Sequence, residues 1–265
     1  MSTLAYALGD SVTMLRRNLR RAVRYPALTV VVAGMPIVFL LLFVFVFGGT
    51  LGAGLGASGS RADYVDFVTP GILLIGVAGA AQGTAISVAM DMNEGIIARF
   101  RTMSIARGSV LTGHVLSSLV QTVVGLVVVL ATALLIGFRP SAGVAAWVGV
   151  AAVLMMATFA LVWLSVAMGL AARSVESASN LPMPLSLLPF FGSGFVPPDS
   201  MPTWLRWFAE YQPFTPIMNT LRALLLGGAV GSNALLAVAW CAVISVGGWL
   251  WARARYERRP ARVSA

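Results

Sequence analysis

Long apolar runs, each of about 20 residues, are the feature that most constrains how this chain can fold. The first covers residues 28–47, and similar runs recur towards the end of the sequence. A helix needs about 20 apolar residues to cross a hydrocarbon core about 30 Å thick. Hydrophobic residues fill 58% of the 265 positions, and a soluble domain of this size would have to expose many of them. The sequence therefore predicts an all-α polytopic membrane protein.

The apolar runs divide into six predicted transmembrane helices, within a transmembrane domain of residues 26–252. The predicted spans are residues 26–47, 67–90, 111–136, 144–170, 175–195 and 233–251. Pro36 is expected to kink the first span, which is too long for the apolar part of a cleavable signal peptide. The glycine-rich stretch that begins at Gly48 is expected to be a loop, because glycine disfavours helix.

Arginine-rich segments lie at both ends of the chain. Residues 1–25 carry leucine and valine at spacings of three and four, which predicts an amphipathic helix in the membrane interface. Residues 253–265 are expected to form a basic tail. If both termini are cytoplasmic, fourteen of the 18 arginines fall on the cytoplasmic side, and this bias predicts that orientation. Because the arginines flank spans, the net charge of +9 does not indicate a nucleic-acid partner.

The sequence contains no lysine and is rich in alanine, valine and glycine, which is typical of a GC-rich bacterial genome. We therefore expect a multi-pass protein of the bacterial plasma membrane. Without lysine the chain cannot contain a Walker A loop, so it is not expected to hydrolyse ATP. The lone histidine, His114, has no cysteine near it in sequence, and no metal site is expected. It is expected to be a hydrogen-bonded histidine near the membrane interface.

Residues 195–230 interrupt the apolar pattern with prolines and aromatic side chains before the sixth span. Trp204, Trp207, Phe208 and Tyr211 recur at helical spacing, as in a short helix lying at the headgroup level. Prolines precede and follow this stretch, and a broken backbone at membrane depth is tolerated only where protein or water covers it. The pattern predicts re-entrant helices on the exterior side. Arg222 would need a carbonyl, headgroup or carboxylate partner there.

Residues 91–109 form a polar segment between the second and third spans. Asp91 and Glu94 lead into it, and Ile97 and Phe100 can share one helical face with Arg99 and Arg101 beside it. An amphipathic helix of this kind fits a groove in a partner protein. A helix resting on lipid is the alternative.

Ionisable residues are missing from the middle of every predicted span, although ion-driven carriers usually place them there. Energy for any transport is therefore expected from another subunit. Gln82 and Gln121 are the notable polar residues within spans, and either hydrogen bonds between helices or contact with a substrate would explain them.

The polar segment and the proline-rich segment carry a resemblance to a known family. The stretch "NEGIIARFRTMSIAR" and the stretch "SGFVPPDSMPTWLRWFAEYQPFTPIMNTLRALLLGG" resemble the permease subunits of ABC-2 type ATP-binding-cassette exporters, above all the daunorubicin-resistance-like drug exporters. In the first, the matching residues are Glu94, Gly95, Ile96, Arg99, Phe100, Arg101, Thr102 and Met103. In the second, they are Pro198, Pro202, Trp204, Leu205, Pro213, Phe214, Thr215, Arg222, Gly227 and Gly228. Ser104 departs from the proline that is usual in the family.

The resemblance implies a permease that moves an amphipathic drug-like or lipid substrate outward. Two permease chains, alike or different, would pair with two ATPase subunits that hold ATP and Mg²⁺, while this chain binds no cofactor. The residues implied in coupling to the ATPase are Asp91, Glu94, Ile97, Arg99, Phe100 and Arg101. The residues implied in an exterior gate are Pro198, Pro202, Trp204, Pro213, Thr215 and Arg222. Candidates for the substrate path are Gln82, Phe190 and Phe191.

Three other interpretations stay open at this point. Export of a glycolipid or a polysaccharide precursor would use a similar permease. A membrane enzyme or a non-transporting membrane subunit belongs to a different class. An enzyme would be expected to gather histidine, aspartate or glutamate at one interface, and a structural subunit would not need a coupling segment.

Overall fold

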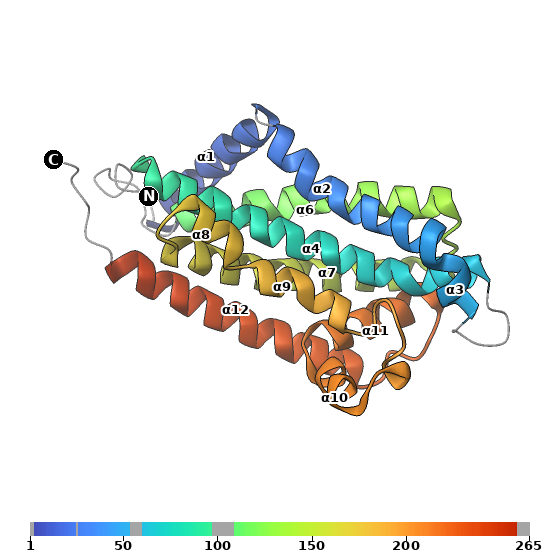
Figure 1. The fold of residues 1–265 in the computed structure, drawn as a ribbon. Helices are drawn as coiled ribbons and strands as arrows, with labels where there is room; N and C mark the ends of the chain where they lie inside the picture. The colour runs from blue at the N-terminus through green and yellow to red at the C-terminus, as the bar shows by residue number, and fades with distance from the viewer. Residues whose placement is uncertain (1–2, 25, 54–59, 97–108, 259–265) are drawn as a thin grey trace.

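The computed structural model describes residues 3–24, 26–53, 60–96 and 109–258, and within these ranges the chain is helical with no β-strand. Figure 1 shows long helices running side by side, with α1 crossing them at one end and α3, α10 and α11 gathered at the other. We call these the α1 end and the α10 end. The all-α membrane architecture predicted from the sequence is confirmed.

Five helices are long and apolar enough to cross a membrane among the described residues. The first crossing combines α2 (Pro26–Leu41), a π-helical turn (Leu42–Phe47) and α3 (Gly48–Ala53), so Gly48 continues a helix where a loop was predicted. The other four are α4 (Arg61–Asn93), α6 (Ser109–Ile136), α7 (Val144–Ala171) and α12 (Asn233–Arg258). α12 continues into the predicted tail, where Arg253 pairs with Glu257 one turn later.

A capping box explains why α4 begins six residues before the predicted second span. The Ser60 hydroxyl accepts a hydrogen bond from the backbone N–H of Asp63 at 3.2 Å, and the Asp63 carboxylate accepts one from the Ser60 N–H at 3.1 Å. These two bonds satisfy backbone donors that the first turn of a helix leaves free. The helix therefore starts at Arg61 in a stretch whose composition suggested a loop.

The fifth predicted span, residues 175–195, is not a continuous helix. It consists of α8 (Val175–Asn180), α9 (Met183–Leu187) and a 3₁₀ turn (Leu188–Phe191). Pro182, Pro184 and Pro189 lie in or beside these pieces, and each proline removes a backbone donor that a longer helix would use. The pieces pack along α4. Hydropathy alone could not distinguish this broken segment from an intact span.

The remaining elements form the α10 end. A 3₁₀ turn (Pro198–Ser200) leads into α10 (Thr203–Tyr211), and α11 (Phe214–Leu226) precedes α12. Short helices therefore fill the segment for which re-entrant helices were predicted, and α11 packs against α12, α7 and α4. Gly227, with φ of 76°, ends α11 in the left-handed conformation that glycine adopts without strain.

α4 and α7 form the centre of the bundle. In the most apolar window of each, 61% of the residues are buried, against 22% or less in the other three crossings. Glycines permit close helix contacts here: a Cβ atom at Gly169 of α7 would lie 2.6 Å from the Ala85 carbonyl oxygen of α4. A Cβ atom at Gly248 of α12 would lie 2.7 Å from the Leu164 backbone nitrogen of α7. Small residues at such contacts are typical of helix packing in membranes.

We expect the Gly248→Val substitution to destabilise the protein by roughly 1–3 kcal/mol, the usual range for overpacking, because the new side chain would force α12 away from α7. Gly247→Val is the matched control, since a Cβ atom at Gly247 meets nothing within 4 Å. Thermal unfolding midpoints of both purified variants measure the difference. Equal losses at both positions would contradict the packing described here.

Candidate functional site

A charged cluster joins three helices at the α1 end, and we call it the junction. Its members are Arg17 and Arg21 of α1 (Thr3–Arg24), Asp91 and Glu94 at the end of α4, and His114 of α6. The Asp91 side chain is fully buried. A buried carboxylate is tolerated only when charge and hydrogen bonds replace the water it has lost.

Three side chains surround the Asp91 carboxylate. Arg17 Nη1 donates to Asp91 Oδ2 at 2.9 Å, and Arg17 Nη2 lies 3.3 Å from Oδ1. Arg21 Nη1 donates to Asp91 Oδ1, and its Nη2 reaches Glu94 Oε1 at 3.4 Å. His114 Nε2 lies 3.2 Å from Asp91 Oδ2. The two-pronged contact of Arg17 is the geometry in which a guanidinium binds a carboxylate most strongly.

The junction depends on a close approach of α1 to α6. A Cβ atom at Gly113 would collide with the Met14 side chain, so only glycine allows α1 to lie this close to the start of α6. The predicted amphipathic helix at residues 1–25 is thus present as α1, and its Arg17 and Arg21 face protein. His114 lies beside Asp91 as a buried side chain, but its Nε2 makes no hydrogen bond among the described residues, so the hydrogen-bonded histidine expected at this position stays a prediction.

Asp91 and Glu94 are the two predicted coupling residues that the structure describes, and both belong to the junction. Gly95, with φ of 68°, turns the chain sharply after α4. The other predicted coupling residues, Ile97, Arg99, Phe100 and Arg101, lie outside the described residues.

The sequence analysis did not predict the pairing of Asp91 with α1. The available signal was the i, i+4 spacing of Arg17 and Arg21, which places two guanidinium groups on one face.

At the α10 end, Arg222 of α11 occupies a partly buried site built mainly from carbonyl groups. Its Nη2 donates to the Ser193 carbonyl at 2.6 Å and to the Phe67 carbonyl at 3.2 Å, and its Nη1 donates to Asn219 Oδ1 at 3.0 Å. The guanidinium carbon lies 4.0 Å from the centroid of the Phe67 ring, a cation–π contact. Of the partners expected for Arg222 from the sequence, the structure shows carbonyls.

Thr215 extends this network. Its hydroxyl donates to the Ala209 carbonyl and lies 3.4 Å from the Ser193 backbone nitrogen, and Ser193 Oγ donates to Asn219 Oδ1 at 2.7 Å. Close backbone contact supports it, because a Cβ atom at Gly71 of α4 would lie 3.0 Å from the Gly194 carbonyl oxygen. Arg222 and Thr215 of the predicted gate are therefore brought together on one side of α11.

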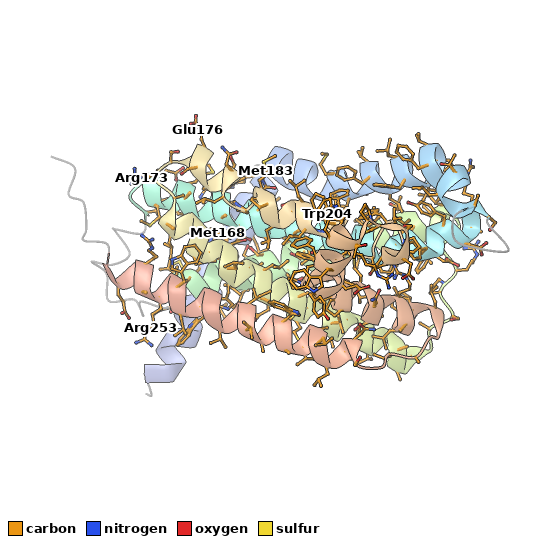
Figure 2. The ribbon with its side chains drawn as sticks, turned by 60° about the horizontal axis from the view of Figure 1, so that its bottom comes forward. Met168, Arg173, Glu176, Met183, Trp204 and Arg253 are labelled. Carbon is orange, nitrogen blue, oxygen red and sulfur yellow. The ribbon has the colours of Figure 1, made fainter. Side chains whose placement is uncertain are left out.

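The other predicted gate residues do not join this network. Pro202 and Pro213 directly precede α10 and α11, and Pro198 begins the 3₁₀ turn before α10. Trp204 is 73% exposed on α10, far along the bundle from Arg173 and Arg253 at the α1 end (Figure 2).

Exposed aromatic and charged side chains cover the outer face of α10. Trp207 and Tyr211 are exposed one turn apart, with ring centroids separated by 5.4 Å. Arg206 hydrogen-bonds Glu210 and pairs with Asp199, and these two carboxylates raise the pKa of the Arg206 guanidinium. This face combines aromatic rings with a paired cation, as expected at a headgroup layer.

The three candidates for the substrate path lie in different surroundings. Gln82 Nε2 donates to the Ser179 carbonyl at 2.9 Å and so ties α4 to α8, while Gln121 bonds Ser117 within α6. Phe190 stacks on Phe195 with centroids 5.0 Å apart. Phe191 is 45% exposed.

Phe190 belongs to an aromatic cluster between the first crossing and the broken segment. The Phe190 ring meets Phe39 edge-on at 5.2 Å, and Phe43 lies 4.6 Å from Phe195, centroid to centroid.

The described part of the chain contains no group of three His, Cys, Asp or Glu side chains placed to hold a metal ion.

We expect Arg222→Met to destabilise the protein by about 2 kcal/mol or more, because the Phe67 and Ser193 carbonyls would lose their donor inside the protein. Arg206→Met is the matched control, since its ion pairs are exposed to solvent and such pairs contribute little to stability. Thermal unfolding, together with limited proteolysis of residues 195–213, measures the effect. If Arg222→Met is no more harmful than Arg206→Met, the carbonyl site does not stabilise this end.

Comparison with known proteins gives consistent matches along most of the chain. The sequence pattern of the family described as ABC-2 type transporter matches residues 11–226. The daunorubicin resistance ABC transporter permease protein DrrB1 of Streptomyces coeruleorubidus is 30% identical over 85% of this chain and 78% of its own length. The probable doxorubicin resistance ABC transporter permease protein DrrC of Mycobacterium tuberculosis is 28% identical over 80% of this chain and 75% of its own length. ABC transporter G family member 20 of Dictyostelium discoideum is 30% identical over 72% of this chain but only 26% of its own length.

Proposed function

Since the chain belongs to the ABC-2 type transporter family, we propose that it is the permease subunit of an exporter that moves amphipathic, drug-like molecules outward across a bacterial plasma membrane. The observation that carries this proposal is the likeness, over more than three quarters of this chain, to permeases named for daunorubicin and doxorubicin resistance. A lipid is the second member of the same amphipathic substrate class.

The energy would come from ATP hydrolysed by a partner subunit, which supplies the nucleotide and Mg²⁺ chemistry. Two ATPase subunits would act on two permease chains. Both termini of each permease chain would be cytoplasmic. The polar segment at residues 91–109 would receive the movement of the ATPase. Because Asp91 is bonded to Arg17 and Arg21 of α1 and lies beside His114 of α6, a force on this segment would reach three helices together.

At the other end, α10 and α11 would cover the exterior side of the route. The Arg222 network ties α11 to α4 through the Phe67 carbonyl and to the broken segment through the Ser193 carbonyl. Movement of α4 would therefore be transmitted to α11. Phe190 and the partly exposed Phe191 lie on the same broken segment and would offer aromatic surface to a planar, amphipathic compound.

Co-purification from native membranes tests the coupling site. We expect wild-type protein to bring down an ATPase, and the Glu94→Ala, Phe100→Ala double variant to lose most of it while remaining folded, because an acidic and an aromatic contact are both removed. The control pair Arg206→Ala, Glu210→Ala removes two exposed side chains of α10 and should keep the ATPase. ATP hydrolysis in the eluate is the measurement. Wild-type protein that comes down alone in several mild detergents would favour a membrane subunit with no transport role.

The substrate class is tested separately with the wild-type complex in lipid nanodiscs. Daunorubicin is the probe, and we expect it to change the rate of ATP hydrolysis at concentrations where glucose has no effect. A complex that ignores daunorubicin but responds to a lipid-linked saccharide would instead favour export of a glycolipid or polysaccharide precursor.

A further inference from the structure

Helix α1 has three faces with different surroundings. Met14 packs against Gly113 of α6, and Arg17 and Arg21 turn towards Asp91 in the junction. The third face points away from both. It carries an apolar stripe, which consists of Val12, Leu15, Leu19 and Val23.

The stripe is open to its surroundings. Val12 is 61% exposed and Val23 is 80% exposed. With the neighbouring arginines, the stripe lines an open groove of about 780 Å³. An amphipathic helix with its apolar face uncovered must find an apolar environment elsewhere.

Three arginines border the stripe. Arg16, Arg20 and Arg24 recur every four residues, and all three are exposed. Among the described residues, no carboxylate lies within ion-pair distance of them, whereas Arg17 and Arg21 are both paired. The arginines of α1 thus divide into one set that binds this protein's own acids and another set that has no acidic partner in the described part of the chain.

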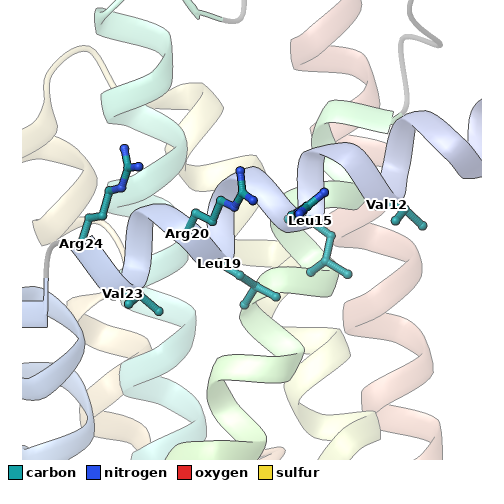
Figure 3. A pocket seen from close by; sticks show the side chains of 7 residues that line it. Val12, Leu15, Leu19, Arg20, Val23 and Arg24 are labelled. Atoms are coloured by element: carbon teal, nitrogen blue, oxygen red, sulfur yellow. The ribbon is translucent and has the colours of Figure 1, made fainter.

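The directions of the side chains identify the partner of the third face. In Figure 3, Val12, Leu15, Leu19 and Val23 point down the bundle, the way α6 runs from its start at Ser109, while Arg20 and Arg24 point the other way. Down the bundle, α6 exposes Val120, Val124 and Val127, as a lipid-facing helix does. The apolar stripe therefore faces the hydrocarbon side and the arginines face the water side. This is the arrangement of a helix lying in a headgroup layer with snorkelling arginines.

We propose that the third face of α1 is a binding surface for anionic phospholipid, with Arg16, Arg20 and Arg24 contacting headgroup phosphates and the apolar stripe inserted beside the acyl chains. Arginine suits a phosphate because its planar guanidinium can donate two hydrogen bonds to it. A partner protein docking on the same stripe would have to displace lipid from beneath the helix. This lipid-binding role is separate from the proposed transport function, and its test does not require transport.

Titration with short-chain phosphatidylglycerol tests the proposal on the full-length protein in mild detergent. We expect phosphatidylglycerol to raise the thermal unfolding midpoint, and phosphatidylcholine at equal concentrations to raise it far less. The Arg16→Gln, Arg20→Gln, Arg24→Gln variant should need about 100-fold more phosphatidylglycerol for the same shift, since each basic residue near an anionic surface contributes about a factor of five. The preference for phosphatidylglycerol should also weaken in 0.5 M salt, because exposed charges are screened.

The control variant, Arg173→Gln, Arg253→Gln, Arg255→Gln, removes the same charge at the α1 end of the bundle and should keep the wild-type titration. The Arg16→Lys, Arg20→Lys, Arg24→Lys variant keeps the charge and should retain most of the preference. Equal responses to the two lipids in wild type, or equal losses in both glutamine triples, would overturn the proposal. So would a glutamine triple at 16, 20 and 24 that binds phosphatidylglycerol normally yet loses the co-purifying ATPase, because the partner would then be a protein.

Discussion

The α1 end of the molecule depends on the hydrogen bonds that the buried carboxylate of Asp91 receives. This carboxylate receives hydrogen bonds from Arg17 and Arg21, two guanidinium groups 70 or more positions earlier in the chain, and it lies 3.2 Å from His114 of the next long helix. A single carboxylate thus fixes α1 against the ends of α4 and α6. With this attachment, α1 presents one face to the protein and leaves the opposite face for the membrane.

At the α10 end, too, protein groups hold a charged side chain inside the bundle, and there the charge is positive. Arg222 is partly buried, and among the described residues its partners are carbonyl oxygens, an asparagine and an aromatic ring. Polar groups inside an apolar chain must be satisfied by protein, because lipid cannot replace water as a hydrogen-bond partner. The carbonyls that meet Arg222 come from α4 and from the broken segment, so this cation joins elements that the sequence separates. Between the two ends, α4 runs as one helix and takes part in both sites.

Hydropathy predicted the unbroken helices well, because a span is a local property of the sequence. The predicted third and fourth spans, residues 111–136 and 144–170, differ from α6 and α7 by at most two residues at either end. The segment at residues 175–195 was misjudged because its prolines outweigh its apolar composition, and the start of α4 was misjudged because a capping box at Ser60 outweighs the glycines before it. The junction could not be predicted from local pattern at all. Pairing of Asp91 with Arg17 and Arg21 depends on how α1 crosses the bundle, and that crossing depends on a glycine contact at Gly113.

A double-mutant cycle between Asp91 and Arg21 is the most direct test of the junction. Unfolding free energies are compared for wild type, Asp91→Asn, Arg21→Gln and the double variant, with the exposed pair Arg253 and Glu257 as the reference cycle. We predict a coupling energy of about 1–3 kcal/mol for Asp91 with Arg21, against about 0.5 kcal/mol or less for the reference pair. A coupling energy near zero between Asp91 and Arg21 would contradict the account, because α1 would then not be held to α4 by this carboxylate.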